Sequence, residues 1–188
     1  MEDLSLHILD IAENSVNAGA TKIKISVIEE SASDLLSLVV EDNGRGMSQE
    51  ECQRAFDPFY TTRQTRRVGL GLPFLQEACQ SAEGNLTLES IPGTGTRVRA
   101  TFRLSHIDRK PIGDIALTLI TLIAGHPEIE WHYYHRINNF EFTFNSQEIK
   151  QSYPGIGLNH PEVLKAIRNY IDQKLSYLRR EHGRSQSL

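Results

Sequence analysis

The chain has 188 residues, of which 39% are hydrophobic and 23% charged, as in an ordinary soluble globular protein of one domain or of one domain with an appendage. The net charge is −4 and no run of like charges dominates, so we expect no nucleic-acid partner. Cys52 and Cys79 do not have the spacing of a metal or redox site, and we expect them to be buried thiols of a protein from a reducing compartment. No basic segment followed by an apolar run opens the chain, and the longest apolar stretch, 115–125, is too short to span a bilayer, so we expect a cytoplasmic protein with no membrane segment.

Residues 4–18 predict an amphipathic helix, because apolar side chains recur at helical spacing. Gly19 stands where a C-terminal cap belongs. His7, Asp10 and Asn14 belong to a polar stripe on the other side of this helix.

Two strands and a loop are predicted next. Residues 22–28 alternate between apolar and polar, which indicates a half-buried strand, and the more apolar stretch 35–41 predicts a second strand. Glycines mark a loop over 42–47. Ser48 and Glu51 have the spacing of a capping box and predict that a short helix begins there.

The following segment reads as a loop, a helix and a hairpin. Two aromatic residues and several threonines and arginines occupy a loop over 57–68. A helix over 73–83 is expected to begin at its proline. Strands over 86–90 and 96–104 are joined by the turn residues 92–95.

The character of the sequence changes after Ser105. An apolar helix is predicted over 113–124, a hairpin within 130–144, and a long amphipathic helix from about residue 159. We therefore divide the chain into a domain, 1–105, and a C-terminal α/β extension, 106–188.

Asp10 and Asn14 are four residues apart and are therefore neighbours on one helix face. Their hard oxygen atoms suit Mg²⁺, which takes few protein ligands and completes its shell with phosphate and water. A solvated face of an amphipathic helix explains the same pair, so this helix alone does not decide between the two.

Asp42 ends an apolar strand, where a ligand can reach it, and Gly44 and Gly46 follow. A carboxylate can accept a hydrogen bond from the exocyclic amine of adenine, and glycines let a flat base approach the backbone. A tight turn is the alternative interpretation.

Gly69 and Gly71 form a glycine loop that leads into a helix, whose N-terminus attracts phosphate. Arg63, Arg66 and Arg67 precede the loop and can pair with phosphate oxygens. A flexible hinge and solvated arginines explain the same residues.

The order of these pieces decides between the interpretations. The series runs Asp10 and Asn14, 42–46, 56–62, 69–71 and 93–96. It resembles the N, G1, F, G2 and G3 boxes of the GHKL (Bergerat-fold) ATPases, which include topoisomerase subunits, heat-shock chaperones, mismatch-repair ATPases and sensor histidine kinases. The resemblance covers residues 4–104.

The resemblance implies a two-layer α/β (α+β) sandwich in which helices cover one face of a mixed β-sheet. It implies ATP or ADP and Mg²⁺ as ligands, with Asn14 as the Mg²⁺ ligand and Asp10 as the catalytic base. It implies that Asp42 anchors adenine and that 60–68 forms a lid over the nucleotide. The nucleotide-binding residues that it implies are Asn14, Asp42, Gly44, Gly46, Met47, Tyr60, Thr61, Thr62, Arg67, Gly69, Leu70, Gly71, Leu72 and Thr96.

Two departures from the family pattern stand out. Asp10 is shorter than the glutamate usual in hydrolysing members, which puts its reach toward water in doubt. Arg67 and Val68 replace a glycine common in kinases, which implies a short and stiffer lid.

Only three residues precede the first helix, so we expect no phosphoacceptor hairpin of the sensor-kinase kind. His7 is interpreted as a neighbour of phosphate or a solvated residue. We expect a Mg-ATP-binding regulatory protein that phosphorylates a histidine or serine of an unidentified protein partner in trans. A slow ATPase and a binding module without turnover, each gating partner binding through the lid, are the alternatives.

The chain as a whole is loosely similar to small stand-alone kinase-like ATP-binding proteins of anaerobic bacteria. Its tail could pack on the core or form a homodimer surface. Its histidines show no metal spacing and are interpreted as surface or hairpin residues: His126, His132, His135 and His160.

Overall fold

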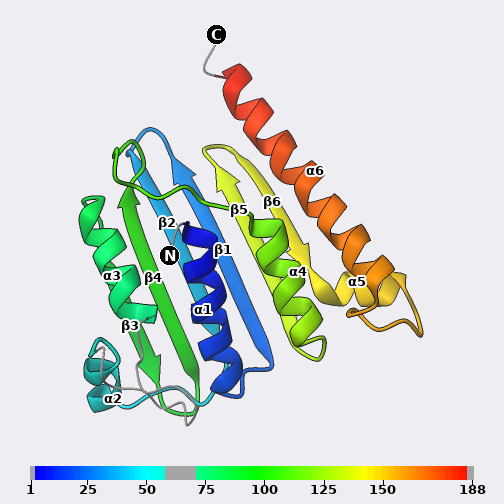
Figure 1. Ribbon diagram of the computed structural model, residues 1–188, viewed down its shortest axis with the longest axis horizontal. Helices are drawn as coiled ribbons and strands as arrows, with labels where there is room; N and C mark the ends of the chain where they lie inside the picture. Colours follow the sequence, from blue (N-terminus) through cyan, green and yellow to red (C-terminus); the bar gives the residue numbers. More distant parts are fainter. Residues whose placement is uncertain (1–2, 58–70, 186–188) are drawn as a thin grey trace.

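The computed structural model describes residues 3–57 and 71–185, and the side chains among them up to residue 181. Within these residues, six strands form one sheet and six helices accompany it (Figure 1). The elements are α1 (Leu4–Asn17), β1 (Lys22–Glu30), β2 (Leu35–Asp42), α2 (Gln49–Arg54), α3 (Gly71–Ser81), β3 (Leu86–Ile91), β4 (Gly95–Arg103), α4 (Ile115–Gly125), β5 (Glu130–Ile137), β6 (Phe140–Asn145), α5 (Ser146–Ser152) and α6 (Pro161–Ser185).

The strands follow the order β3-β4-β2-β1-β5-β6 across the sheet. Neighbouring strands are antiparallel except β1 and β5, which are parallel, so the sheet is mixed. The parallel pair is possible because α4 carries the chain back across the sheet before β5 begins. The tail after residue 105 therefore continues the same sheet.

Alternation along the strands decides which side chains are covered. Ile25, Val40, Val98 and Tyr133 are matched across the four central strands and are all buried. Their side of the sheet carries α1, α3 and α4, and α6 packs against α4, β5 and β6 (Figure 1). These contacts confirm the predicted sheet with helices on one face.

Two helices differ from the prediction. α3 begins at Gly71, two residues before Pro73, because a proline in the first turn loses no intrahelical hydrogen bond. α5 was not predicted, since its seven residues have no apolar periodicity; it is capped by Asn145, whose side chain accepts from the Gln147 amide. The capping box of Ser48 and Glu51 at α2 is confirmed.

His7 corrects the expectation of a solvated side chain. It is only 1% exposed, and neither ring nitrogen has a hydrogen-bond partner among the residues that the structure describes. Burial, together with the charge of Lys110, lowers the pKa of His7 to about 4. The helical pattern missed this because the chain returns over the start of α1, where the Leu4 amide donates to the Pro111 carbonyl at 2.9 Å.

His135 also departs from a surface position, although it lies in the predicted hairpin. It is fully buried, with Nδ1 2.7 Å from the Tyr133 hydroxyl and Nε2 2.9 Å from Glu29 Oε1. Cys79 is buried as expected, and burial raises the pKa of its thiol to about 12, so it stays protonated. Cys52 is only partly buried.

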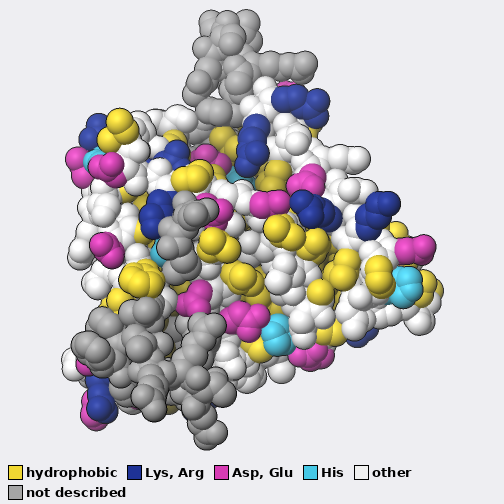
Figure 2. Space-filling view, in the orientation of Figure 1, with side chains coloured by type: hydrophobic (Ala, Val, Ile, Leu, Met, Phe, Trp, Pro, Cys, Tyr) yellow, Lys and Arg dark blue, Asp and Glu magenta, His cyan; other side chains and the backbone are white. Residues whose placement is uncertain are grey.

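The outer surface of the helix layer mixes hydrophobic side chains with charges of both signs (Figure 2). Leu6 on α1 and Leu117 on α4 are 40% and 45% exposed. Among the residues described, no helix combines the length and apolarity that crossing a membrane requires. The same residues contain no group of three or more His, Cys, Asp or Glu side chains arranged to hold a metal ion.

Candidate nucleotide-binding site

Asp42 is the last residue of β2 and its side chain lies on the helix-covered side of the sheet. Its Oδ2 accepts from the Ser15 hydroxyl of α1 at 2.6 Å. Its Oδ1 accepts from the backbone amides of Gly44 at 2.9 Å and Thr96 at 3.2 Å. Three donors from three segments therefore hold one partly exposed carboxylate in a fixed orientation.

This arrangement leaves the Asp42 carboxylate with acceptor capacity. An ionised carboxylate has about four lone-pair sites, and three are used by Ser15, Gly44 and Thr96. The remaining site can accept an N–H of a bound ligand, such as the exocyclic amine of a purine. Ser15 was not among the predicted site residues, because its position on the apolar face of α1 indicated only packing.

Gly46 shows how closely the loop after Asp42 lies against the β3–β4 turn. Its φ is +64°, and a β-carbon built on it would lie 2.0 Å from the Ile91 carbonyl oxygen. Backbone oxygen cannot move aside easily, so only glycine fits. A side chain at this position would push the loop away from the turn.

Backbone hydrogen bonds fix this loop on both sides. The Arg45 amide donates to the Ala18 carbonyl at 2.9 Å, and the Arg45 carbonyl accepts from the Gly93 amide at 2.7 Å. The Asn43 side chain accepts from the amides of Thr21 and Lys22, both at 2.9 Å. The loop is therefore held between the end of α1 and the β3–β4 turn before any ligand binds.

Ser90 lies on the other side of the site, and no local sequence pattern indicated it. Its hydroxyl accepts from the Met47 amide at 2.8 Å, donates to the Gly95 carbonyl at 3.0 Å and lies 2.8 Å from the Thr96 hydroxyl. The predicted residues Met47 and Thr96 thus meet through a serine that local patterns left as an ordinary strand residue.

Asp10 and Asn14 follow one another by one turn of α1, as predicted. The Asp10 carboxylate lies against the first residue of α3, since a β-carbon built on Gly71 would be 1.7 Å from Asp10 Oδ2. A negative charge is favourable at this positive end of a helix. Asn14 is exposed one turn nearer the Asp42 loop. Leu72, the next residue of α3, is partly buried and packs on the core.

Six predicted nucleotide-binding residues lie outside the described part of the chain, so the structure does not place them. They are Tyr60, Thr61, Thr62, Arg67, Gly69 and Leu70. The described residues bring together Asp42, Gly44, Gly46, Met47 and Thr96.

The described site fits an adenine nucleotide. It offers a fixed carboxylate with spare acceptor capacity, a loop with glycines at positions 44 and 46, and a helix N-terminus at Gly71. For Mg²⁺ the exposed amide of Asn14 offers a hard oxygen, and phosphate and water would supply the other ligands.

Comparison with known proteins agrees with this geometry. Residues 2–106 match the family model described as "Histidine kinase-, DNA gyrase B-, and HSP90-like ATPase". The match spans more than half of the chain.

Similar curated proteins are bacterial sensors and kinases. The sensor protein EvgS of Escherichia coli O157:H7 is 33% identical over 107 residues, which cover 55% of this chain and 9% of EvgS. The signal transduction histidine-protein kinase AtoS of Escherichia coli K12 is 35% identical over 98 residues, 52% of this chain and 15% of AtoS. The sensor protein kinase FleS of Pseudomonas aeruginosa is 35% identical over 108 residues, 57% of this chain and 26% of FleS. The chain thus spans about a quarter or less of the length of these relatives.

A solved structure supports the fold alone. The crystal structure of the N-terminal domain of a DNA repair protein superposes with a TM-score of 0.54 at 13% identity, covering 82% of this chain and 58% of that one. The mixed sheet, the helices on one face and the family match over residues 2–106 lead to one conclusion. This chain belongs to the family of histidine kinase-, DNA gyrase B- and HSP90-like ATPases.

Proposed function

We propose that this chain binds Mg-ATP at the site around Asp42 and transfers the terminal phosphoryl group to a separate protein. The observation that carries the binding is the Asp42 carboxylate, held by Ser15, Gly44 and Thr96 with one acceptor site to spare. In this proposal Asn14 holds Mg²⁺, and Gly46, Met47 and Gly71 let the nucleotide approach the backbone.

Asp10 is the proposed catalytic base. Its carboxylate lies at the start of α3, where the family places the nucleotide phosphates, and it would take the proton of the attacking histidine or serine. The similarity to sensor kinases supports transfer to protein rather than to water. His7 lies one turn before Asp10 but is buried, which supports an acceptor on another molecule.

Binding is tested by calorimetry with Mg-ATP on the full chain and two matched variants. Asp42→Asn removes the negative charge and replaces one acceptor oxygen by an NH₂ donor, and it should weaken binding about tenfold or more. Glu41→Gln is the control, because Glu41 is the preceding residue of the same strand and pairs with Lys24 and Arg97 on the uncovered face. Equal affinities in all three proteins would refute the assignment of Asp42.

Turnover is tested with γ-labelled ATP and Mg²⁺, with and without cell extract. A labelled second protein supports the kinase, free phosphate alone indicates a slow ATPase that gates a partner, and neither product indicates a binding module. Asp10→Asn should abolish whichever turnover is seen and leave ATP affinity within a few fold. Turnover that survives this change would rule out Asp10 as the base.

A further inference from the structure

β6 forms one of the two edges of the sheet and has β5 as its neighbour. Its six residues, Phe140–Asn145, include neither lysine nor proline, which commonly protect an edge strand from pairing with another chain. The outer side of β6 is therefore a candidate surface for binding a further strand.

The hairpin that joins β5 to β6 shows which backbone groups point outward. Its loop has only two residues, so Ile137 and Phe140 form a hydrogen-bonded pair where the ladder begins. Such pairs alternate along antiparallel strands, which makes Phe142 the next residue of β6 that bonds to β5. The N–H and C=O groups of Glu141 and Thr143 therefore point away from β5, and neither residue has a backbone hydrogen bond to another described segment.

α6 packs beside this edge on the helix-covered side of the sheet (Figure 1). The Tyr170 ring packs edge-on against the Phe142 ring, with centroids 5.7 Å apart. Arg168 instead pairs with Asp114 at the start of α4, so Tyr170 belongs to the flank of α6 that is directed away from α4. Tyr177 follows seven residues later on the same flank, and both rings are exposed.

An unpaired positive charge lies on the same flank. The Lys174 ammonium is 5.6 Å from the centroid of the Tyr170 ring and forms no ion pair with a residue in the described part of the chain. A segment bound along β6 would therefore be favoured by an acidic side chain that is directed toward α6.

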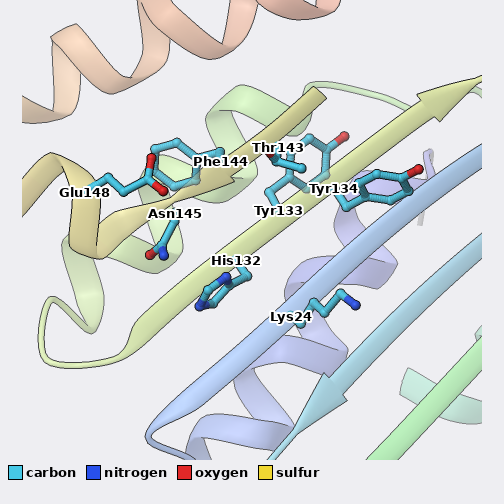
Figure 3. A pocket seen from close by; sticks show the side chains of 8 residues that line it. All are labelled: Lys24, His132, Tyr133, Tyr134, Thr143, Phe144, Asn145 and Glu148. Carbon is cyan, nitrogen blue, oxygen red and sulfur yellow. The ribbon is translucent and has the colours of Figure 1, made fainter. Parts of the chain in front are cut away.

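The other face of β6 is polar. It borders a pocket of about 370 Å³ whose lining comes from β1, β5, β6 and α5 and includes the Thr143 side chain (Figure 3). Glu141 is exposed on the same face, and its carboxylate accepts from the Tyr134 hydroxyl at 2.8 Å. The edge thus presents polar side chains on one face and aromatic rings on the other.

We infer that β6 binds one extended segment of a partner protein, which adds to the sheet as a further antiparallel strand beside α6. The backbone of the segment pairs with the N–H and C=O groups of Glu141 and Thr143, as in other complexes formed by strand addition. Its alternate side chains follow the two faces of the edge. An acidic one, opposite Phe142, pairs with Lys174, its apolar neighbours on that face lie along the aromatic rings, and polar ones occupy the other face.

A second copy of this chain does not supply that strand through its own β6. Antiparallel pairing of two β6 strands needs a two-fold axis normal to the sheet, which keeps the helices of both copies on one face. Because α6 lies at the outer edge, the two α6 helices would then compete for the space above the paired strands. A single extended segment brings no helix and avoids this conflict.

The probe is the peptide acetyl-Thr-Val-Thr-Asp-Thr-Val-Thr-amide, whose valines and aspartate share one face of a strand. Titrated into the full ¹⁵N-labelled chain, it should give saturable amide shifts in β6 and in residues 170–177 of α6, with a Kd of about 1 mM or tighter. Amide exchange at Glu141 and Thr143 should slow in the complex. Absence of saturable shifts, or shifts only outside β6 and α6, would overturn the proposal.

Two altered peptides separate the backbone from the charge. N-methylation of the two inner threonines removes donors to β6 and should weaken binding at least about tenfold. Lysine in place of the aspartate should weaken it about fivefold, because it repels Lys174. An N-methylated peptide that binds as tightly as the parent would exclude strand addition, and equal affinities of the aspartate and lysine peptides would exclude the acidic contact.

Variants of the chain test the same contacts. Thr143→Pro removes the outward N–H, which an edge strand tolerates, and should weaken peptide binding about tenfold, whereas Thr143→Val keeps the N–H and should not. Lys174→Gln should weaken binding about threefold, and Lys165→Gln, nine residues earlier and half a turn around α6, should leave it unchanged. Equal losses in a variant and its control would overturn the assignment. Thermal unfolding checks that Thr143→Pro is folded; if it is not, Lys174→Gln and the N-methylated peptide still decide.

Sedimentation of the chain alone tests the other occupant of this edge. A dimer that Thr143→Pro dissociates would overturn the partner segment in favour of a second copy. Mg-ATP affinity should be the same in Thr143→Pro and the unaltered chain, so failure here leaves the nucleotide site untouched.

Discussion

At the scale of single residues, the nucleotide site depends on atoms that have little freedom to move. The Asp42 carboxylate has three donors from the protein, and Gly46 has backbone oxygen where a side chain would stand. Such groups are ordered before the ligand arrives, so binding loses little conformational entropy. Two predictions concern residues of this kind, one in the loop and one in α1.

Replacing Gly46 by alanine should cost about 3 kcal/mol of unfolding free energy, because a positive φ and a clash with the Ile91 carbonyl add together. Gly93→Ala is the matched control, since Gly93 also has a positive φ, +74°, but open space around its β-carbon position. It should cost only about 1 kcal/mol. Denaturant unfolding measures both, and equal losses would contradict the steric argument.

His7 should make the protein lose stability as the pH falls. Its folded pKa of about 4 lies below the unfolded value of 6.5, so the unfolded chain binds a proton that the folded chain does not. Stability is therefore lost as pH falls from about 6.5 to about 4, by about 3 kcal/mol in total. His7→Leu should flatten this slope in urea unfolding series. His160→Gln, at an exposed histidine, should not, and a slope shared by wild type and His7→Leu would exclude His7 as its source.

At the scale of elements, the site exists where several chain segments end together. The end of α1, the loop after β2 and the β3–β4 turn are joined by the hydrogen bonds of Arg45 to Ala18 and Gly93. The Ser90 hydroxyl of β3 accepts from the Met47 amide of the same loop and donates to the Gly95 carbonyl of β4. Loops joined in this way can present backbone groups to a ligand without moving.

Ser90→Ala should release the Met47 amide and the Thr96 hydroxyl from their shared partner. We expect a loss of about 1 to 2 kcal/mol in stability and of about tenfold in Mg-ATP affinity. Thr87→Ala, on the exposed side of the same strand, serves as the control. Calorimetry and thermal unfolding measure both effects, and an unchanged ATP affinity in Ser90→Ala would show that the loop keeps its place without this serine.

At the scale of the whole molecule, the family segment and the tail share one sheet. β5 is parallel to β1, and Trp131 and Tyr133 of β5 are buried in the common core with the helix α4. The division into a domain, 1–105, and an extension, 106–188, stays a prediction, while the packing links the two parts in one core.

A chain of residues 1–106 should therefore be much less stable than the full chain. Removing β5 leaves the edge of β1 unpaired and exposes apolar side chains that α4 covers. We expect a lower Tm and aggregation, measured by circular dichroism and light scattering. A monomeric 1–106 fragment with the Tm of the full chain would show that the segment folds independently of the tail.

Local patterns determined much of this protein. Helical spacing, strand alternation and turn residues predicted the bounds of the main elements to within a few residues. They do so because the spacing of apolar residues shows which side of a helix or strand is buried. The order of five segments, from Asp10 and Asn14 through 42–46, 56–62 and 69–71 to 93–96, resembled the boxes of the GHKL ATPases, and the family match over residues 2–106 confirms it. That information is contained in short stretches of sequence.

Only the tertiary structure decided which distant segments meet. The parallel pairing of β5 with β1, the burial of His7 and His135, and the role of Ser90 depend on contacts between residues far apart in the chain. The pocket on the uncovered face depends in the same way on the register of three strands. No local period encodes such contacts, because they follow from the free energy of packing the whole sheet against its helices.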